Sequence, residues 1–275
     1  MISPTTTNKR IMKSKLNIIL LLLVSATALG QSKFNLITTI NVDCDFFTTD
    51  NQSNIYTVKA NELTKYDKTG KELYKYSNKN FGNISFVDAS NMLKILVYYK
   101  DFLQVVLLDN TLSITGDPIS LEQIGFLQGQ LVCSSNNSGM WIYDQQNFEL
   151  VRLDQNLLPT QKTGNLTSTL NEVLQPNLLL EYNNRVYLNN PASGILVFDV
   201  YGTYFKTIPV KNAVSVQSVG DWVYYVANKK VNAYNLKTTE EKKFEMPLSD
   251  FQNFRLELGT LILQAKNSIF LYTAE

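Results

Sequence analysis

The sequence predicts an all-β protein and, within that class, a six-bladed β-propeller closed by an N-terminal strand that completes the last blade. Three observations predict it. Short strands dominate the 275 residues, a strand-and-turn unit recurs about every 41 residues, and a spare strand at the start matches a missing one at the end. Forty-odd residues suit one four-stranded blade, because each small sheet has two apolar faces that only neighbouring sheets can cover.

Residues 1–30 have the layout of a secretory signal peptide. Four basic residues precede an apolar run at residues 18–24, and small residues follow up to Gly30. The run is well short of the ~20 residues that span a bilayer, so we expect cleavage and no transmembrane span afterwards. The expected organisation is a leader, residues 1–30, and a single propeller domain, residues 31–275. We expect export to the periplasm or the outer membrane, with an extracellular location left open.

The strands after the leader alternate β-branched and aromatic residues and are separated by Asn, Asp and Gly. Helical periodicity is weak, and residues 167–174 and 248–254 are the helix candidates. The recurring unit is a strand that ends in a polar residue. Its last residues, one in each blade, are Asp67, Asp109, Asp144, Asp199, Asn235 and Thr273.

Six blades account for the strands of this pattern. Blade 1 takes strands A to D at residues 44–48, 54–58, 62–67 and 72–76, and blades 2 to 5 take residues 84–120, 124–163, 176–209 and 214–247. Blade 6 begins near Phe254 and has three strands. Residues 34–40 supply its fourth, which would leave no open sheet edge at the seam.

Two stretches of blade 1 resemble NHL-type six-bladed propellers. Residues 50–58 (DNQSNIYTV) are similar to the Asp, Gly-Asn, Ile-Tyr-Val strand of that repeat, with Ser53 where the family usually has Gly. Residues 65–71 (KYDKTGK) are similar to the Phe/Tyr-Asp-x-x-Gly turn that follows, and residues 198–202 carry a fainter copy. The resemblance implies a scaffold used mainly to bind proteins or other ligands, with enzymes a minority.

Composition excludes several functions. The chain has no histidine, which rules out every mechanism or metal site that depends on imidazole. It has 25 basic and 24 acidic residues, and the leader accounts for four of the basic ones, so we expect no nucleic-acid partner. In an exported protein Cys44 and Cys133 could form a disulfide. They fall on strand A of blade 1 and strand B of blade 3, about a third of the ring apart, so we expect free, buried thiols instead.

Carboxylates on inner strands are the candidates for a metal site. In a propeller they could converge on the central channel and hold Ca²⁺, as metal-dependent lactonases and esterases on six-bladed propellers do. The alternative is that they end strands or cap turns in water, and then no cofactor is expected. The candidate residues are Asp43, Asp45, Asp88, Glu181, Asp221 and Glu257.

A long interval between blades 3 and 4 is the candidate partner-binding segment. Asp144 and Asp199 are 55 residues apart, and we place the surplus at residues 157–175, on the face with the D–A and B–C loops. We expect it to pack over the channel mouth or to contact a partner. Its apolar residues are Leu158, Leu166, Leu170, Val173 and Leu174.

The expected function is that of a non-catalytic exported propeller that binds a protein partner in the bacterial cell envelope. An accessory or plug subunit of an outer-membrane export or assembly machine would be one such role. Two alternatives stay open: a metal-dependent hydrolase that uses the channel carboxylates, and a glycan-binding module that uses exposed aromatic residues.

Overall fold

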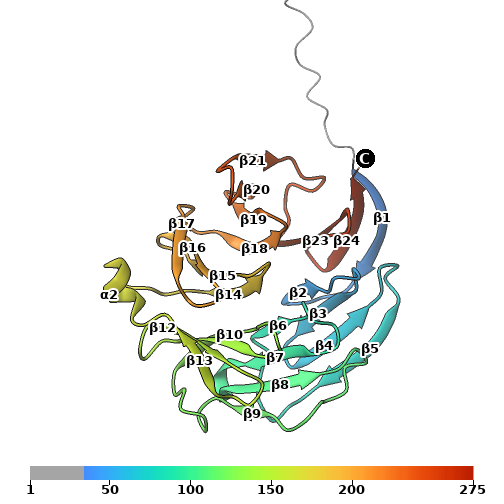
Figure 1. The fold of residues 1–275 in the computed structure, drawn as a ribbon. Coiled ribbons are helices and arrows are strands. Elements are labelled where there is room, and N and C mark those ends of the chain that lie inside the picture. Colours follow the sequence, from blue (N-terminus) through green and yellow to red (C-terminus); the bar gives the residue numbers. More distant parts are fainter. Residues whose placement is uncertain (1–33, 275) are drawn as a thin grey trace, which may run out of the picture. The chain divides into compact units, whose positions relative to one another are not determined.

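The computed structural model describes residues 34–274, which form six four-stranded antiparallel sheets arranged as the blades of a propeller (Figure 1). This confirms the predicted fold class. In blades 1 to 5 the four strands, A to D, are consecutive in the chain, and blade 6 takes its D strand from the N-terminal segment.

The strands of each blade, A to D, are as follows. Blade 1 comprises β2 (Phe46–Thr49), β3 (Ile55–Lys59), β4 (Glu62–Tyr66) and β5 (Glu72–Ser77). Blade 2 comprises β6 (Phe86–Asp88), β7 (Ile95–Tyr99), β8 (Gln104–Leu108) and β9 (Ile119–Ser120), and blade 3 comprises β10 (Gly129–Ser134), β11 (Met140–Asp144), β12 (Glu149–Leu153) and β13 (Pro159–Lys162). Blade 4 comprises β14 (Leu178–Tyr182), β15 (Arg185–Asn190), β16 (Gly194–Asp199) and β17 (Tyr204–Ile208). Blade 5 comprises β18 (Val214–Val219), β19 (Trp222–Ala227), β20 (Lys230–Asn235) and β21 (Glu241–Phe244), and blade 6 comprises β22 (Asn253–Glu257), β23 (Thr260–Ala265), β24 (Ser268–Ala274) and β1 (Phe34–Asn41).

Strand β7 shows why the middle strands are continuous apolar runs. All five of its residues are buried, although successive side chains point to opposite faces of the sheet. Val97 and Tyr99 pack in a cluster with blade 1, whereas Leu96 and Tyr98 pack in a cluster with blade 3. Neither face of such a blade meets solvent near the middle of the ring. The side chains on both faces of the strand must therefore be apolar.

Six hydrophobic clusters lie at the six interfaces between neighbouring blades. They join blades 1 and 2, 2 and 3, 3 and 4, 4 and 5, 5 and 6, and finally 6 and 1. The apolar core is thus a closed circuit of inter-blade layers, as expected when each sheet is stable only between two neighbours.

The seam between the first and last blades is closed by β1, as the sequence predicts. β1 pairs with β24 in antiparallel register, with Ile40 opposite Ile269 and Thr39 opposite Phe270 (Figure 1, blue beside red). Ile40 is buried in the cluster between blades 6 and 1. Closure therefore combines backbone pairing with burial of an apolar side chain.

The recurring polar residue after a strand closes the C–D turn. In blade 1, one oxygen of Asp67 accepts hydrogen bonds from the backbone N–H groups of Thr69 and Lys71, at 2.8 and 3.0 Å. A carboxylate or amide that binds the backbone two to four residues ahead stabilises such a turn locally. The equivalent residues in blades 2 to 5 are Asp109, Asp154, Asp199 and Asn235.

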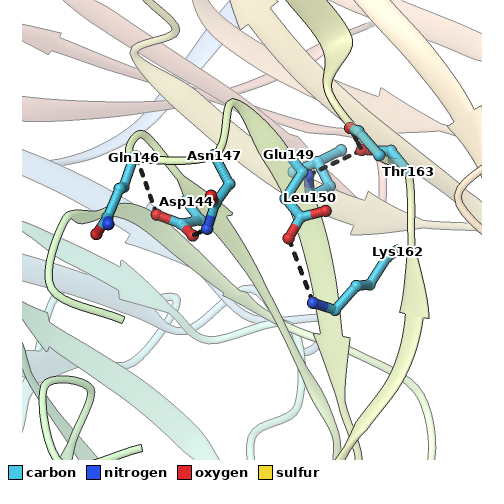
Figure 2. A network of polar contacts seen from close by, with 8 residues as sticks. Asp144, Gln146, Asn147, Glu149, Leu150, Lys162 and Thr163 are labelled. Atoms are coloured by element: carbon cyan, nitrogen blue, oxygen red, sulfur yellow. Dashed lines mark hydrogen bonds and ion pairs between the residues drawn. The ribbon is translucent and has the colours of Figure 1, made fainter. Parts of the chain in front are cut away.

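Blade 3 corrects the predicted register of the repeat. Asp144 ends β11, the second strand, and binds Gln146 and Asn147 of the B–C turn (Figure 2). The residue that matches the other blades is Asp154, which lies 45 residues before Asp199 instead of 55. Both aspartates cap turns after apolar strands, so local sequence does not distinguish them. The same shift places Cys133 on strand A, β10, and not on strand B.

The described residues contain two short helices, the 3-10 helix η1 (Lys100–Phe102) and α2 (Leu166–Leu170). Asn165 caps the start of α2 and Asn171, with φ of 52°, ends it, so α2 is shorter than the predicted segment. The helix expected at residues 248–254 is wrong. Leu248 and Phe251 instead lie in an irregular connection, where they pack against the cluster between blades 5 and 6.

The predicted signal peptide, residues 1–30, lies outside the described residues. Between residues 34 and 274, no helix has the length and apolar character required to cross a bilayer.

Candidate functional site

Two cavities lie along the inner strands, one toward each face of the ring. One has a volume of about 510 Å³ and is lined by the C-terminal ends of A strands, including Thr49, Asp88 and Tyr182; we call it the AB cavity, after the A–B turns on that face. The other has a volume of about 210 Å³ and is lined by the N-terminal ends of A strands. We call it the DA cavity, after the connections on that face from each D strand to the next A strand. The described residues that line both come from blades 1, 2, 4, 5 and 6.

Apolar side chains of three successive blades surround part of the AB cavity. Tyr182, Val219 and Leu258 are exposed by 40, 38 and 81%, and they belong to blades 4, 5 and 6. Leu180 and Val216 continue this wall deeper into the cavity. Exposed apolar residues that gather around a hollow are typical of an interaction site, whereas scattered ones are ordinary.

Glu181 joins blades 3 and 4 beside this cavity. Its carboxylate accepts hydrogen bonds from the Ser135 hydroxyl at 2.6 Å, the Trp141 indole N–H at 2.7 Å and the Asn136 backbone N–H at 3.2 Å. The Ser135 oxygen in turn accepts from Nε of Arg152 at 2.8 Å. Glu181 therefore holds two blades together.

Glu257 and Asp88 form similar links between blades. One oxygen of Glu257 accepts from the Thr49 hydroxyl at 2.7 Å and from the Gln217 amide at 3.0 Å, so it joins blade 6 to both of its neighbours. Asp88 accepts from the backbone N–H of Ser134 in blade 3, at 2.8 Å. Burial raises the pKa of Glu257, and the hydrogen bonds from Thr49 and Gln217 oppose this.

The other three predicted carboxylates pair with lysines away from these links. Asp43 and Asp45 precede β2 on the DA face and both lie 3.0 Å from Nζ of Lys59. Asp221 follows β18 on the AB face and lies 2.9 Å from Nζ of Lys237. Since the six carboxylates lie on two faces, they do not converge. Within residues 34–274 the Cys, Asp and Glu side chains form no group of three or more that could hold a metal ion.

The predicted partner-binding segment divides into buried and exposed residues. Leu166 and Leu174 are buried in the cluster between blades 3 and 4, and Leu170 packs against it, so these three are part of the core and not of a docking surface. Leu158 and Val173 are exposed. The apolar character of the segment is therefore explained mainly by packing.

Residues 163–175 lie on the B–C turns of blades 3 and 4 and line neither cavity, so they do not cover the channel mouth. The Leu166 N–H donates to the Phe148 carbonyl of the blade 3 turn, and Asn190 of the blade 4 turn donates to Glu172 at 2.9 Å. Contacts with the start of β12 fix the end of β13, from which this segment continues (Figure 2). Lys162 pairs with Glu149, and the Thr163 hydroxyl accepts a hydrogen bond from the Leu150 N–H.

Arg255 is the residue of this region that the sequence analysis missed. It lies on β22, is partly buried, and lines both cavities. Burial lowers the pKa of its guanidinium, and nearby Glu257 and Asp88 raise it. The signal in the sequence is a single basic residue in an inner strand, β22, and this by itself does not distinguish a channel residue from a surface one.

The two cysteines are free and buried, as expected. Burial raises the pKa of Cys44 to about 11 and holds that of Cys133 well above its ordinary value. A thiol that stays protonated is a poor nucleophile and metal ligand, which favours a packing role.

Comparisons with known proteins support the fold. No protein-family model and no curated protein sequence matches the chain. Among solved structures, the WD40 domain of Pan2 from Neurospora crassa matches 89% of this chain and 96% of its own, with a TM-score of 0.63 and 8% identity. Virginiamycin B lyase from Staphylococcus aureus matches 88% and 99%, with a TM-score of 0.62 and 12% identity.

A catalytically inactive histidine-to-alanine variant of that lyase, solved with quinupristin, is also similar, with a TM-score of 0.58 and 14% identity over 88% of each chain. BamB from Moraxella catarrhalis matches 88% of this chain and all of its own, with a TM-score of 0.52 and 10% identity. At these identities the likenesses show the six-bladed propeller fold and no family. They include a lyase, so the fold does not choose between an enzyme and a binding protein.

Proposed function

We propose that this protein is a non-catalytic exported propeller that binds a protein partner in the bacterial cell envelope, and that the AB cavity receives a segment of that partner. The observation that carries the proposal is the exposed apolar rim of Tyr182, Val219 and Leu258 around a 510 Å³ hollow. Hydrophobic and aromatic anchors of a partner bind best in such central, partly desolvated pockets.

Charge indicates which partner segment would fit. Besides the apolar rim, the cavity is lined by Asp50, Asp88, Glu181 and Glu257, and Arg255 is the basic residue of the lining, which gives a formal charge of −3. Complementary charge favours association and correct orientation. The segment that we propose therefore carries apolar side chains together with Lys or Arg.

The state of the carboxylates supports a binding role over hydrolysis. Asp88, Glu181 and Glu257 are each held by hydrogen bonds between blades, so none is free to act as a general base or to approach a metal ion without breaking a link. Loss of one histidine inactivates the structurally similar lyase, and this chain contains no histidine. The chemistry of that lyase therefore offers no model for this protein.

The leader pattern of residues 1–30 supports export, and the closed ring supports a scaffold role. An accessory or plug subunit of an outer-membrane export or assembly machine is the role that we favour. Such a subunit needs a rigid surface with one specific docking site, which the AB face offers.

Site-specific photo-crosslinking in native cells tests the proposal. A photoreactive amino acid at Leu258 or Val219 should capture one envelope protein, whereas the same probe at Ile114, which is also exposed, should not. A probe at Val173 tests the segment before blade 4 in the same way. If the probes at Leu258 and Val219 capture no protein, or if the probe at Ile114 captures the same protein equally well, the AB cavity is not the partner site.

A polar hollow beside the AB cavity favours glycan binding as the second candidate. It has a volume of about 360 Å³, and Tyr182 stands at its edge, where it could stack on a sugar ring. Its amides supply paired donors and acceptors suited to hydroxyl groups. They belong to Asn91, Asn136, Asn137, Asn183 and Asn184. Two results together would favour this function. The protein would bind to a glycan array and lose this binding in Tyr182→Ala, and the photoreactive probe at Leu258 would capture no protein.

A further inference from the structure

The geometry of the DA cavity points to a ligand. We infer that this cavity binds a carboxylate group on a short apolar stem, and that the guanidinium of Arg255 holds it through paired hydrogen bonds. The DA cavity faces the other side of the ring from the AB cavity, and the two share Arg255 and five further lining residues. The inference concerns a small ligand on the DA side and requires no protein partner in the AB cavity.

Arg255 has donors to spare. A guanidinium carries five N–H donors, and the hydrogen bond that Arg255 makes is to the Phe254 carbonyl, at 3.3 Å. Within residues 34–274, no carboxylate oxygen lies within 4.0 Å of its nitrogens, although Glu257 and Asp88 are near enough to act on it electrostatically. The side chain is thus a partly buried cation without a direct ion pair.

The two nearby acids are kept from pairing with Arg255 by their own contacts. Thr49 and Gln217 hold Glu257, and the backbone N–H groups of Ser90 and Ser134 hold Asp88. To reach the guanidinium, either carboxylate would have to give up a link between blades. A buried charge without a close partner is unfavourable, so an external anion would offset a cost that the fold itself leaves uncompensated.

The remaining lining of the DA cavity suits an apolar stem. Phe46, Phe86, Leu178 and Val214 supply apolar surface for the stem, and among the described lining residues Arg255 is the one that carries a charge. The rest of the lining includes amides and hydroxyls, which can bind the polar end of the ligand; they belong to Thr48, Ser85, Asn177, Asn189, Ser215 and Asn253. A planar guanidinium matches a carboxylate bidentately, which a point charge would not. Its 210 Å³ is below the usual 300–1,000 Å³ of sites for drug-sized ligands, so we expect a small molecule or the end of a longer chain.

Thermal unfolding with matched probes tests the inference. The carboxylates are 4-methylpentanoate and N-acetyl-Gly-Val-Leu with a free C-terminus, and each is compared with its neutral amide. A ligand that binds the folded state raises the unfolding temperature in a saturable manner. We expect this for at least one carboxylate and for neither amide. A response to 4-methylpentanoate indicates a free small carboxylate as the ligand, and a response to the peptide alone indicates a chain end.

Variants of Arg255 test whether its guanidinium causes the rise in unfolding temperature with the carboxylates. Arg255→Met should weaken the binding of the carboxylate at least tenfold and leave the unfolding temperature of the free protein unchanged or higher, because it removes an unpaired charge. Arg255→Lys keeps the charge and loses the bidentate geometry, so it should bind with intermediate affinity. Arg185→Met, which removes an arginine stacked on Phe205, is the matched control and should bind as the wild type does.

Two results would overturn the inference. One is that neither carboxylate raises the unfolding temperature of the wild-type protein. The other is that Arg255→Met responds to the carboxylate as strongly as the wild type does.

Discussion

Replacing Glu181 by Ala tests whether the carboxylates around the AB cavity are structural links. In the folded protein the Trp141 side chain is fully buried, and its indole N–H donates to Glu181 at 2.7 Å. The Ser135 hydroxyl donates to the same oxygen at 2.6 Å, and the Asn136 N–H, from an exposed residue, donates to the other at 3.2 Å. Removal of the carboxylate leaves all three donors without this acceptor.

The magnitude follows from these contacts. A hydrogen bond to a charged group contributes about 1.5–3 kcal/mol, and a buried donor without a partner costs about 1–3 kcal/mol. Two short bonds are lost in Glu181→Ala, one of them from a buried donor, while the exposed Asn136 N–H is solvated by water. We therefore expect the free energy of unfolding to fall by about 3–5 kcal/mol. Glu181→Gln keeps one acceptor oxygen and should cost about 1–2 kcal/mol.

Urea unfolding followed by tryptophan fluorescence measures these losses, and the indole N–H resonance of Trp141 should shift in both variants. Trp222, the other tryptophan, serves as the internal reference. Glu122→Ala is the matched control at an exposed acid and should change the free energy by less than about 0.5 kcal/mol. A loss below about 1 kcal/mol in Glu181→Ala, with an unmoved Trp141 resonance, would refute the structural role.

Three further outcomes are expected. Burial raises the folded-state pKa of Glu257 above its ordinary 4.5, so ionisation of this carboxyl opposes folding. The stability of Glu257→Gln relative to the wild type should therefore rise as the pH increases from 4.5 to 7. A difference in urea titrations that does not depend on pH would contradict this. Ile40→Ala should destabilise the closed ring by about 2–4 kcal/mol, whereas the exposed Ile37→Ala should have little effect, and equal losses would reject closure by β1. Cys44 and Cys133 should react with a thiol reagent at pH 8 far more slowly in the native protein than in denaturant, and two rapidly reacting native thiols would show that they are not buried.

Much of the fold could be predicted because its signals are local. Asp67 and Asp199 close turns with backbone groups two and four residues ahead, so each leaves a short, repeated pattern in the sequence. Ile95 to Tyr99 show that both faces of a sheet are covered, since the whole strand is apolar. The same local character explains the error in blade 3, where Asp144 and Asp154 both cap turns.

The candidate site was less predictable because its contacts join distant parts of the chain. Thr49 and Glu257 are 208 residues apart, and Glu181 and Trp141 are 40 apart. Whether a carboxylate in the sequence links two blades or pairs with a surface lysine depends on which turn lies beside it. Leu166 and Leu174 illustrate the same point for apolar residues, since a segment rich in leucine can form a docking surface or part of the core.

By itself the amino-acid sequence determined the all-β class, the number of blades and the strand that closes the ring, because alternation and turn chemistry act over a few residues. Only the tertiary structure decided where polar groups meet: it assigned Asp88, Glu181 and Glu257 to links between blades, separated them from Asp43 and Asp45, and left Arg255 between two cavities. The physical reason is that charge and hydrogen-bond partners around a channel are fixed by closure of the ring, which brings together side chains far apart in sequence.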